Sequence, residues 1–214
     1  MIATFRDHEK EKSMLLLKPG LRLYKAALDR AAQEALLDDL RAVLRAAPLF
    51  RPRMPRSGQE FSVRMSNCGP LGWVSDISGY RYQAFHPETG RPWPPMPDSV
   101  SKLWRDFAEC ALEPDACLIN HYDEAARMGP HQDRDEADVS APILSLSLGC
   151  SCRFRYGGET RRDPSATVRL DSGDIVVFGG PARLMFHGVD RILPGTSTLL
   201  NPPGRINLTL RRAR

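Results

Sequence analysis

The 214-residue sequence contains no long hydrophobic run, since none of its apolar stretches approaches the roughly 18 residues that a membrane span needs. Cysteine is sparse and odd in number, with five residues, so a secreted fold held by disulfides is not expected. The first residues, MIATFRDHEKEK, carry charges where a secretory signal has its apolar segment. We therefore expect a cytoplasmic protein without a membrane segment.

Lysine is also scarce, because 25 of the 30 cationic residues are arginine and only five are lysine. Guanidinium groups suit phosphates and carboxylates, but a GC-rich genome would produce the same bias. The formal net charge of +4 is mildly favourable for nucleic acid. With 42% hydrophobic and 26% charged residues, the composition is that of a globular protein and does not identify a partner.

Two helices are predicted in the N-terminal half. The first covers residues 29–47, where Asp29 can cap the helix and apolar residues recur at three- and four-residue spacing before Pro48. The second helix begins after Asp98, which is predicted to cap it, and carries an apolar stripe. The residues of that stripe are Val100, Leu103, Trp104, Phe107 and Ala111.

The segment 51–97 between these helices is dense in Arg, Gly, Pro and aromatic residues. Such a composition is typical of loops and short strands that cover a binding site, so we interpret 51–97 as a lid.

After Pro114 the pattern changes to short strands separated by Gly, Pro and Asp turns, with no helices between them. The predicted strands are 117–122, 143–148, 152–156, 167–170, 174–178, 183–187 and 205–211. This arrangement excludes a doubly wound α/β sheet and favours an antiparallel sandwich or jelly roll. We predict an α+β protein with an all-β core, in which the N-terminal helices cover one sheet.

A first candidate site is the tripeptide His131-Gln132-Asp133, because residues i and i+2 of an extended segment share a face. One imidazole and one carboxylate, completed by a distant histidine, form the facial triad of non-heme Fe(II) oxygenases. About 0.4 such H-x-D triplets are expected by chance in this composition, so the motif alone is weak. The candidates for the third ligand are His8, His86, His121 and His187.

His187 ends the predicted strand 183–187 and precedes Gly188, which places it at a strand edge. Alone it would be interpreted as a core histidine; together with the H-x-D triplet it favours a metal site.

The segment RINLTLR at 205–211 is the sharpest pattern in the chain. Period two places Arg205, Asn207, Thr209 and Arg211 on one face, and Ile206, Leu208 and Leu210 on the other. The polar face could point to solvent, yet R-x-N-x-T-x-R arises by chance in only about 0.002 chains of this length. Two inward arginines could bind the two ends of a dicarboxylate, and Asn120 and Tyr122 would add donors from another strand.

These motifs resemble those of the Fe(II)/2-oxoglutarate dioxygenases, and within them the AlkB group. HQD at 131–133, FHG at 186–188 and RINLTLR at 205–211 carry the resemblance. Further similar segments are MSNCGPLGWVSDISGYRY (65–82), RPWPPMP (91–97), PDACLINHYDEAARMGPHQDRDE (114–136), APILSLSLG (141–149) and GDIVVFGGPARLMFHG (173–188). The similarity covers roughly residues 55–212.

The resemblance implies a role for each matching residue. Iron would be held by His131, Asp133 and His187. The cosubstrate 2-oxoglutarate would be bound at its distal carboxylate by Arg205, Tyr122 and Asn207, and at its C1 end by Arg211 and Asn120, with Thr209 on the same strand face. The substrate base would stack on Trp73 with His131 on its other face, Asp135 would read its edge, and Met65, Tyr80 and Arg161 would line the nucleotide site.

The resemblance also implies a double-stranded β-helix, or jelly roll, in one domain over 1–214. That domain comprises an extension and helix at 1–50, a nucleotide-recognition lid at 51–97, and a helix plus catalytic core at 98–214. The implied reaction uses Fe(II), 2-oxoglutarate and O₂ to demethylate 1-methyladenine and 3-methylcytosine in DNA, releasing formaldehyde, succinate and CO₂. Single strands are the expected partner, with duplex DNA and RNA left open, and the protein is expected to be a monomer.

Two positions depart from the family pattern. Phe178 stands where the best-known bacterial member has Trp, and Arg162 adds a second positive charge beside Arg161, which leaves base and strand preference open.

Two other functions remain to be weighed. One is a dioxygenase of the same chemistry acting on a protein or lipid, which the aromatic lid argues against. The other is an inactive jelly roll that binds single-stranded nucleic acid, which would have no use for the inward pair Arg205 and Arg211.

Overall fold

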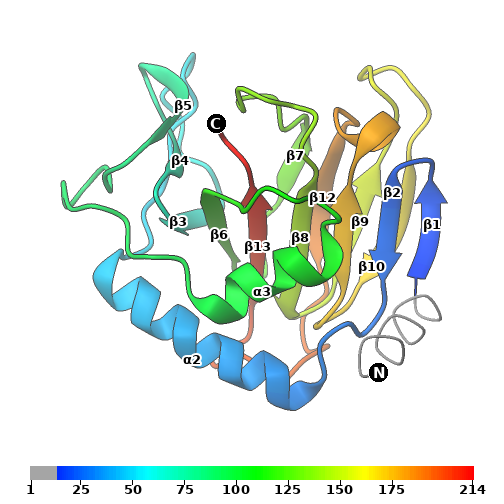
Figure 1. Cartoon of the computed structure of the whole chain (residues 1–214), viewed down its shortest axis with the longest axis horizontal. Helices are drawn as coiled ribbons and strands as arrows, with labels where there is room; N and C mark the ends of the chain where they lie inside the picture. The colour runs from blue at the N-terminus through cyan, green and yellow to red at the C-terminus, as the bar shows by residue number, and fades with distance from the viewer. Residues whose placement is uncertain (1–13) are drawn as a thin grey trace.

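The structure is a computed structural model that describes residues 14–214. Its centre is a seven-stranded sheet with the strand order β1-β2-β11-β8-β13-β6-β3 (Figure 1). The bounds are β1 Met14–Lys18, β2 Leu21–Tyr24, β3 Arg64–Cys68, β6 Ala116–Tyr122, β8 Ile143–Gly149, β11 Ile175–Phe178 and β13 Arg205–Arg211.

A second sheet of four strands, in the order β10-β9-β12-β7, packs against the first, and a separate hairpin pairs β4 with β5. Their bounds are β4 Gly72–Asp76, β5 Gly79–Gln83, β7 Met128–His131, β9 Cys152–Tyr156, β10 Ala166–Leu170 and β12 His187–Ile192. All strand pairs in the three sheets are antiparallel. The predicted jelly roll with an all-β core is therefore confirmed.

Two helices, α2 (Arg30–Ala46) and α3 (Asp98–Phe107), cover the outer face of the seven-stranded sheet (Figure 1). The Asp29 side chain caps α2 by accepting a hydrogen bond from the backbone N–H of Ala32 at 2.8 Å, as predicted. The predicted cap of α3 is wrong, because Pro97 precedes the helix and no side chain caps it. Asp98 is instead the first helical residue, where a carboxylate still complements the helix dipole.

The apolar stripe predicted for the second helix extends too far, since α3 ends at Phe107 and Ala111 lies beyond it. No helix among residues 14–214 has the length and apolarity that crossing a bilayer requires.

Strand β13 shows how the alternating pattern is used. It lies between β8 and β6, and all seven of its residues are buried. Ile206, Leu208 and Leu210 pack toward the helices. The polar residues on the opposite face therefore point toward the four-stranded sheet rather than into solvent.

The strand predicted at 183–187 is wrong. A short 3₁₀ helix, η1 (Gly180–Ala182), follows β11, and a turn leads to β12, which begins rather than ends at His187. The backbone N–H of Met185 bonds the carbonyl of Ala182, which keeps this segment in a turn. Arg183 is buried there and donates to the carbonyls of Ala141 and Asp133. The hydrogen bonds from Arg183 to these distant carbonyls therefore favour the turn over the strand that the alternating pattern predicted.

Several strands have no counterpart in the prediction. Residues 14–24 form β1 and β2, which extend the large sheet beside β11, and β7 carries His131 in the small sheet. Within the segment 51–97, β3 joins the large sheet beside β6, and only the β4–β5 hairpin stands apart from both sheets (Figure 1). His8 lies outside the described residues.

Candidate active site

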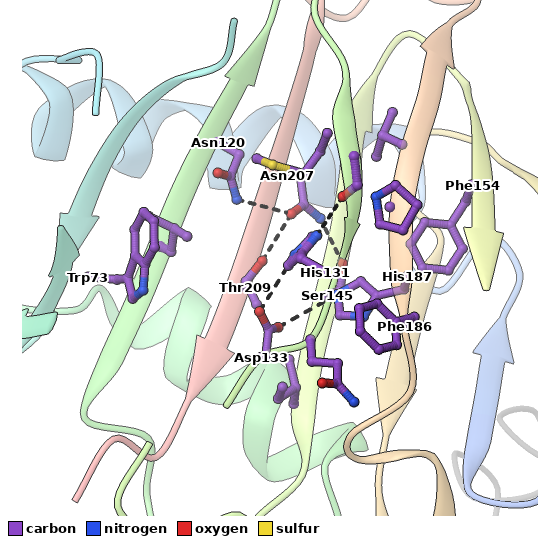
Figure 2. A pocket seen from close by; sticks show the side chains of 18 of the residues that line it. Trp73, Asn120, His131, Asp133, Ser145, Phe154, Phe186, His187, Asn207 and Thr209 are labelled. Carbon is purple, nitrogen blue, oxygen red and sulfur yellow. Dashed lines mark hydrogen bonds and ion pairs between the residues drawn. The ribbon is translucent and has the colours of Figure 1, made fainter. Parts of the chain in front are cut away.

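A cavity of about 570 Å³ opens between the two sheets. It is lined by residues from both sheets and from the β4–β5 hairpin, and Figure 2 shows Trp73 on one side and His187 with Phe154 and Phe186 on the other. The face of β13 that carries Arg205 and Arg211 also lines it. Every residue predicted for metal, cosubstrate or substrate binding lies on the wall of this one cavity.

Three ligand-type side chains meet in the cavity. One ligand atom each of His131, Asp133 and His187 lies within 4.8 Å of the other two. His131 Nε2 is 3.6 Å from Asp133 Oδ1, and His187 Nε2 is 3.7 Å from Asp133 Oδ2. His131 and His187 are directly opposite each other on β7 and β12, which brings their rings to 4.5 Å between centroids. Strand pairing thus assembles two histidines that are 56 residues apart in the sequence.

The hydrogen bonds of the two imidazoles select the nitrogen that faces the centre. Nδ1 of His131 donates to the carbonyl of Gly129 at 2.9 Å, and Nδ1 of His187 donates to that of Met185 at 3.0 Å. With Nδ1 protonated, each Nε2 carries a free lone pair that points toward Asp133. Burial and the neighbouring His131 lower the pKa of His187 to about 4, so this ring is neutral at physiological pH, as a metal ligand must be.

The Asp133 carboxylate is kept ionised in a buried position. Burial by itself would raise its pKa, but the positive charge of Arg211 outweighs burial and lowers the pKa below the usual range. Arg211 Nη2 lies 2.8 Å from Asp133 Oδ1. The facial arrangement of two imidazoles and one carboxylate is the donor set of Fe(II) oxygenases.

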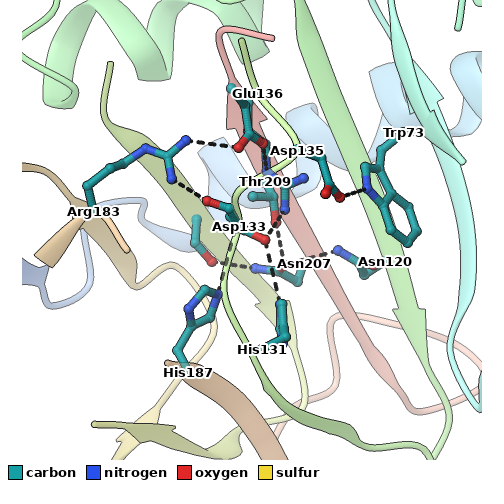
Figure 3. A network of polar contacts seen from close by, with 12 residues as sticks. Trp73, Asn120, His131, Asp133, Asp135, Glu136, Arg183, His187, Asn207 and Thr209 are labelled. Atoms are coloured by element: carbon teal, nitrogen blue, oxygen red, sulfur yellow. Dashed lines mark hydrogen bonds and ion pairs between the residues drawn. The ribbon is translucent and has the colours of Figure 1, made fainter. Parts of the chain in front are cut away.

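A buried polar network behind Asp133 was not predicted from the sequence (Figure 3). Glu136 accepts from Arg183 at 3.0 Å and from the hydroxyl of Tyr82 at 2.6 Å. Tyr82 in turn accepts from Arg211 at 3.0 Å. The network joins the β4–β5 hairpin, through Tyr82, to the arginine that contacts Asp133. Glu136 could have been suspected from its place in the acidic run HQDRDE, residues 131–136. Arg183 could not, because the segment 183–187 was predicted as a strand.

Arg205 shows what kind of ligand the cavity is built for. Its side chain is 1% exposed, and Nη2 donates to Ser147 Oγ at 2.8 Å. Its Nε and Nη1 atoms are buried without any hydrogen-bond acceptor. An unsatisfied buried guanidinium is costly, so a carboxylate in the cavity fits these two donors. The residues present therefore fit 2-oxoglutarate as well as a metal ion.

The amide of Asn207 holds the neighbouring side chains in place. Its Nδ2 donates to Ser145 Oγ at 2.7 Å and to the carbonyl of Leu146, while its Oδ1 accepts from Thr209 at 3.0 Å and from Asn120 at 3.4 Å. Asn207 is therefore already committed to protein partners, whereas Asn120 Oδ1 has no donor.

Tyr122 and Met65 are buried side chains of the cavity wall. Burial raises the pKa of Tyr122 even though Arg205 opposes that shift, so the Tyr122 hydroxyl stays protonated and can donate a hydrogen bond.

At the outer part of the cavity the β4–β5 hairpin presents an aromatic platform. Trp73 stacks on Tyr80 with ring centroids 5.6 Å apart and an interplanar angle of 19°, and Phe61 meets Trp73 edge-on at 6.3 Å. The Trp73 indole N–H donates to Asp135 Oδ2 at 2.8 Å (Figure 3). Tyr80 is half exposed, whereas Asp133 and His187 are buried, so the platform lies nearer to solvent than these two side chains.

The remaining predicted positions are also placed. Arg161 lines the cavity and lies over the ring of Phe186, 5.0 Å from its centroid, whereas the neighbouring Arg162 is exposed. Phe178 is buried against His187, with ring centroids 4.6 Å apart. Phe178, one of the two residues that depart from the family pattern, therefore contacts a candidate metal ligand directly.

The two other histidines among residues 14–214 do not belong to the triad. His86 is buried with its Nε2 2.7 Å from the carbonyl of Pro48. His121 faces away from the cavity and accepts from Arg64 at 3.3 Å.

Comparison with known proteins agrees with this geometry. Residues 20–211 match the model of the 2OG-Fe(II) oxygenase superfamily. The chain is 52% identical over 200 residues to the alpha-ketoglutarate-dependent dioxygenase AlkB homolog of Caulobacter vibrioides, covering 94% of this chain and 90% of that protein. It is 42% identical to the DNA N(6)-methyladenine demethylase ALKBH1C of Arabidopsis thaliana, covering 96% of this chain and 52% of that protein.

Among solved structures, OsALKBH1 superposes with a TM-score of 0.79 at 32% identity, covering 93% of this chain and 99% of that one. The predicted cofactors, Fe(II) and 2-oxoglutarate, are those of the matched superfamily. The chain therefore belongs to the AlkB family of the 2OG-Fe(II) oxygenases and is an Fe(II)- and 2-oxoglutarate-dependent dioxygenase.

Proposed function

We propose that the protein removes methyl groups oxidatively from alkylated bases in nucleic acid, with 1-methyladenine and 3-methylcytosine in single-stranded DNA as its preferred substrates. The observation that carries the proposal is a single cavity that holds the His131–Asp133–His187 triad inside and the Trp73–Tyr80 platform at its outer part. The name of the Arabidopsis relative, a DNA N(6)-methyladenine demethylase, supports a nucleic-acid substrate.

The chemistry of the substrate explains why an oxygenase is needed. A methyl group on an aromatic ring nitrogen has no good hydrolytic exit, so its C–H bond must be oxidised before formaldehyde can leave. Fe(II) bound by the triad would supply the oxidation of that C–H bond by O₂, of which one oxygen atom goes to the methyl carbon and the other to succinate as 2-oxoglutarate loses CO₂. The base must leave the stack to enter the cavity, which costs less in a single strand than in a duplex.

The residues of this chain position the reactants. Arg205 would bind the distal carboxylate of 2-oxoglutarate with its two free donors, and Tyr122 would add a hydroxyl donor. Arg211 lies 2.8 Å from the Asp133 carboxylate and keeps it ionised in its buried position.

Recognition of the damaged base rests on charge and stacking. The two proposed adducts are cationic near neutral pH, so the face of the Trp73 indole offers a cation–π attraction that a normal base lacks. Asp135 orients Trp73 through Oδ2, and its second oxygen is left to receive a base. A base would use the face of Trp73 opposite Tyr80, since Tyr80 already covers one face.

The test is turnover of matched oligonucleotides that contain 1-methyladenine or 3-methylcytosine as single-stranded DNA, duplex DNA and RNA, with Fe(II) and 2-oxoglutarate. Mass spectrometry should show that each repaired base loses about 14 Da, the mass of CH₂, and that formaldehyde and succinate form. Single-stranded DNA should react fastest.

Succinate formation without base repair on any oligonucleotide would instead favour a dioxygenase of another target. Binding of single strands without iron-dependent succinate would favour an inactive binding protein.

A further inference from the structure

The outer face of the four-stranded sheet, which points away from the cavity, carries four arginines. Arg153 and Arg155 lie on β9, Arg169 on β10 and Arg191 on β12. On β9 they alternate with buried residues such as Phe154, so their side chains leave the sheet on its solvent side. None of them takes part in the active site described above.

Three of these arginines form a row across three strands. Arg153 is directly opposite Arg169 on β10 and directly opposite Arg191 on β12. Neighbouring strands are about 4.8 Å apart, and like charges directly opposite each other destabilise a sheet. The stability of the sheet therefore does not account for this row.

Acidic side chains balance the arginines only in part. Asp190 lies 3.6 Å from Arg153 and 2.8 Å from Arg155, and Asp171 lies 2.6 Å from Arg169 but also pairs with Lys25. Arg191 has no ion pair within residues 14–214. The side chains of Arg153 and Arg169 remain 48% and 58% exposed. The result is a solvated surface with excess positive charge.

The loop 157–165, in which Glu159 and Asp163 balance two arginines, connects this surface with the mouth of the cavity. The loop 157–165 joins β9 to β10 and carries Arg161, which lines the cavity, and the exposed Arg162. Arg155 Nη1 donates to Ser165 Oγ in the same loop at 2.9 Å. Arg153 lies three residues, or about 10 Å along β9, from Tyr156, which pairs with His187.

We propose that the row Arg153, Arg169 and Arg191 binds the phosphodiester backbone of a single-stranded nucleic acid whose target base occupies the cavity, an inference that rests on the proposed function. Guanidinium groups bind phosphate oxygens in a bidentate manner. The path turns from the cavity mouth around the loop 157–165 onto the opposite face of the same sheet. A duplex, with a persistence length of about 50 nm, resists such a turn, whereas a single strand follows it easily.

The experiment compares binding of an unmodified single-stranded DNA 20-mer by fluorescence anisotropy at several salt concentrations, using anaerobic protein loaded with Fe(II) and 2-oxoglutarate. The test variant is R153Q/R169Q/R191Q. The matched control removes three exposed arginines from α2 on the opposite side of the molecule, as R30Q/R41Q/R45Q. Each phosphate contact in a single strand contributes about 0.7 to the slope of log Kobs against log salt.

The slope should therefore become shallower by about 2 in the test variant and stay unchanged in the control. A charge-conserving R153K/R169K/R191K variant should retain most of the slope. An unchanged slope in the test variant, an equal loss in the control, or the same loss in the lysine variant would each overturn the proposal.

A second arm separates this proposal from the proposed function. A methylated trinucleotide is too short to reach the row, so the test variant should demethylate it at the wild-type rate. If neither protein demethylates it, the proposed function fails, while the salt dependence of the 20-mer still decides whether the row binds nucleic acid.

Discussion

Replacing Arg205 by lysine tests the cosubstrate site most directly. The arginine is buried, one of its terminal nitrogens is bonded to Ser147, and its Nε and Nη1 donors have no protein acceptor. A lysine keeps the positive charge but replaces the planar fork by a single ammonium group. The variant therefore removes the bidentate geometry without removing the charge.

The expected loss is that of one charge-assisted hydrogen bond, about 1.5–3 kcal/mol. Because about 1.4 kcal/mol corresponds to a factor of ten, 2-oxoglutarate should bind about 10- to 150-fold more weakly to Arg205→Lys than to the wild type.

Isothermal titration of 2-oxoglutarate into anaerobic, Fe(II)-loaded protein measures this difference, with Arg191→Lys on the outer face of the small sheet as the matched control. The rise in Tm on adding 2-oxoglutarate should shrink in parallel, because that rise depends on Kd. A Kd that stays within two-fold of wild type, in a variant that is folded, would refute the assignment of Arg205 to the cosubstrate.

Four further changes probe other parts of the molecule. Asp133→Ala should abolish succinate formation with the fold retained by circular dichroism, and wild-type turnover at limiting iron would disprove the ligand assignment. Trp73→Ala should lower kcat/KM for methylated single strands by about 5- to 150-fold while sparing 2-oxoglutarate turnover without nucleic acid; a joint fall of both activities and of Tm would show a packing role instead. Tyr82→Phe should lower stability by about 1–3 kcal/mol in denaturant unfolding, because it leaves Glu136 Oε1 without its hydroxyl donor, and an unchanged midpoint would contradict that. Ser151, Lys25 and Arg169 outweigh burial and lower the pKa of Asp171 from 3.8 to about 2, so Asp171→Asn should lower Tm at pH 7, and the difference from wild type should shrink as pH falls from about 4 to about 2. A difference that is constant over this range would rule out that linkage.

Local sequence patterns were enough to predict most strands of the β-core. The period of two in RINLTLR predicted an apolar and a polar face for β13, and the structure buries both, one against the helices and one in the cavity. The pattern cannot distinguish a solvent-facing strand from one that lines a cavity, because the residue types are the same. Its low chance frequency and the companion motif HQD made the second interpretation preferable.

Prediction failed where distant groups override local preference. The residues 183–187 alternate like a strand, yet Arg183 is held by the carbonyls of Ala141 and Asp133. Strand β2 pairs with β11, about 150 residues later in the chain, and β1 joins the large sheet only by pairing with β2. Neither the carbonyls that hold Arg183 nor the partner strand β11 can be recognised from the sequence around the segments they stabilise.

The sequence by itself determined the types of side chain that the chemistry needs and their spacing: an imidazole and a carboxylate two residues apart, a late histidine, and four polar side chains on one face of a strand. The sequence already favoured His187 as the third ligand, and only the tertiary structure decided how it reaches the site, because the pairing of β7 with β12 places it opposite His131. Only the structure revealed the network of Glu136, Arg183 and Tyr82 behind Asp133, and the row of arginines outside the small sheet. The physical reason is that strand register and burial, which set distances and electrostatic environment, depend on pairing between segments far apart in the chain.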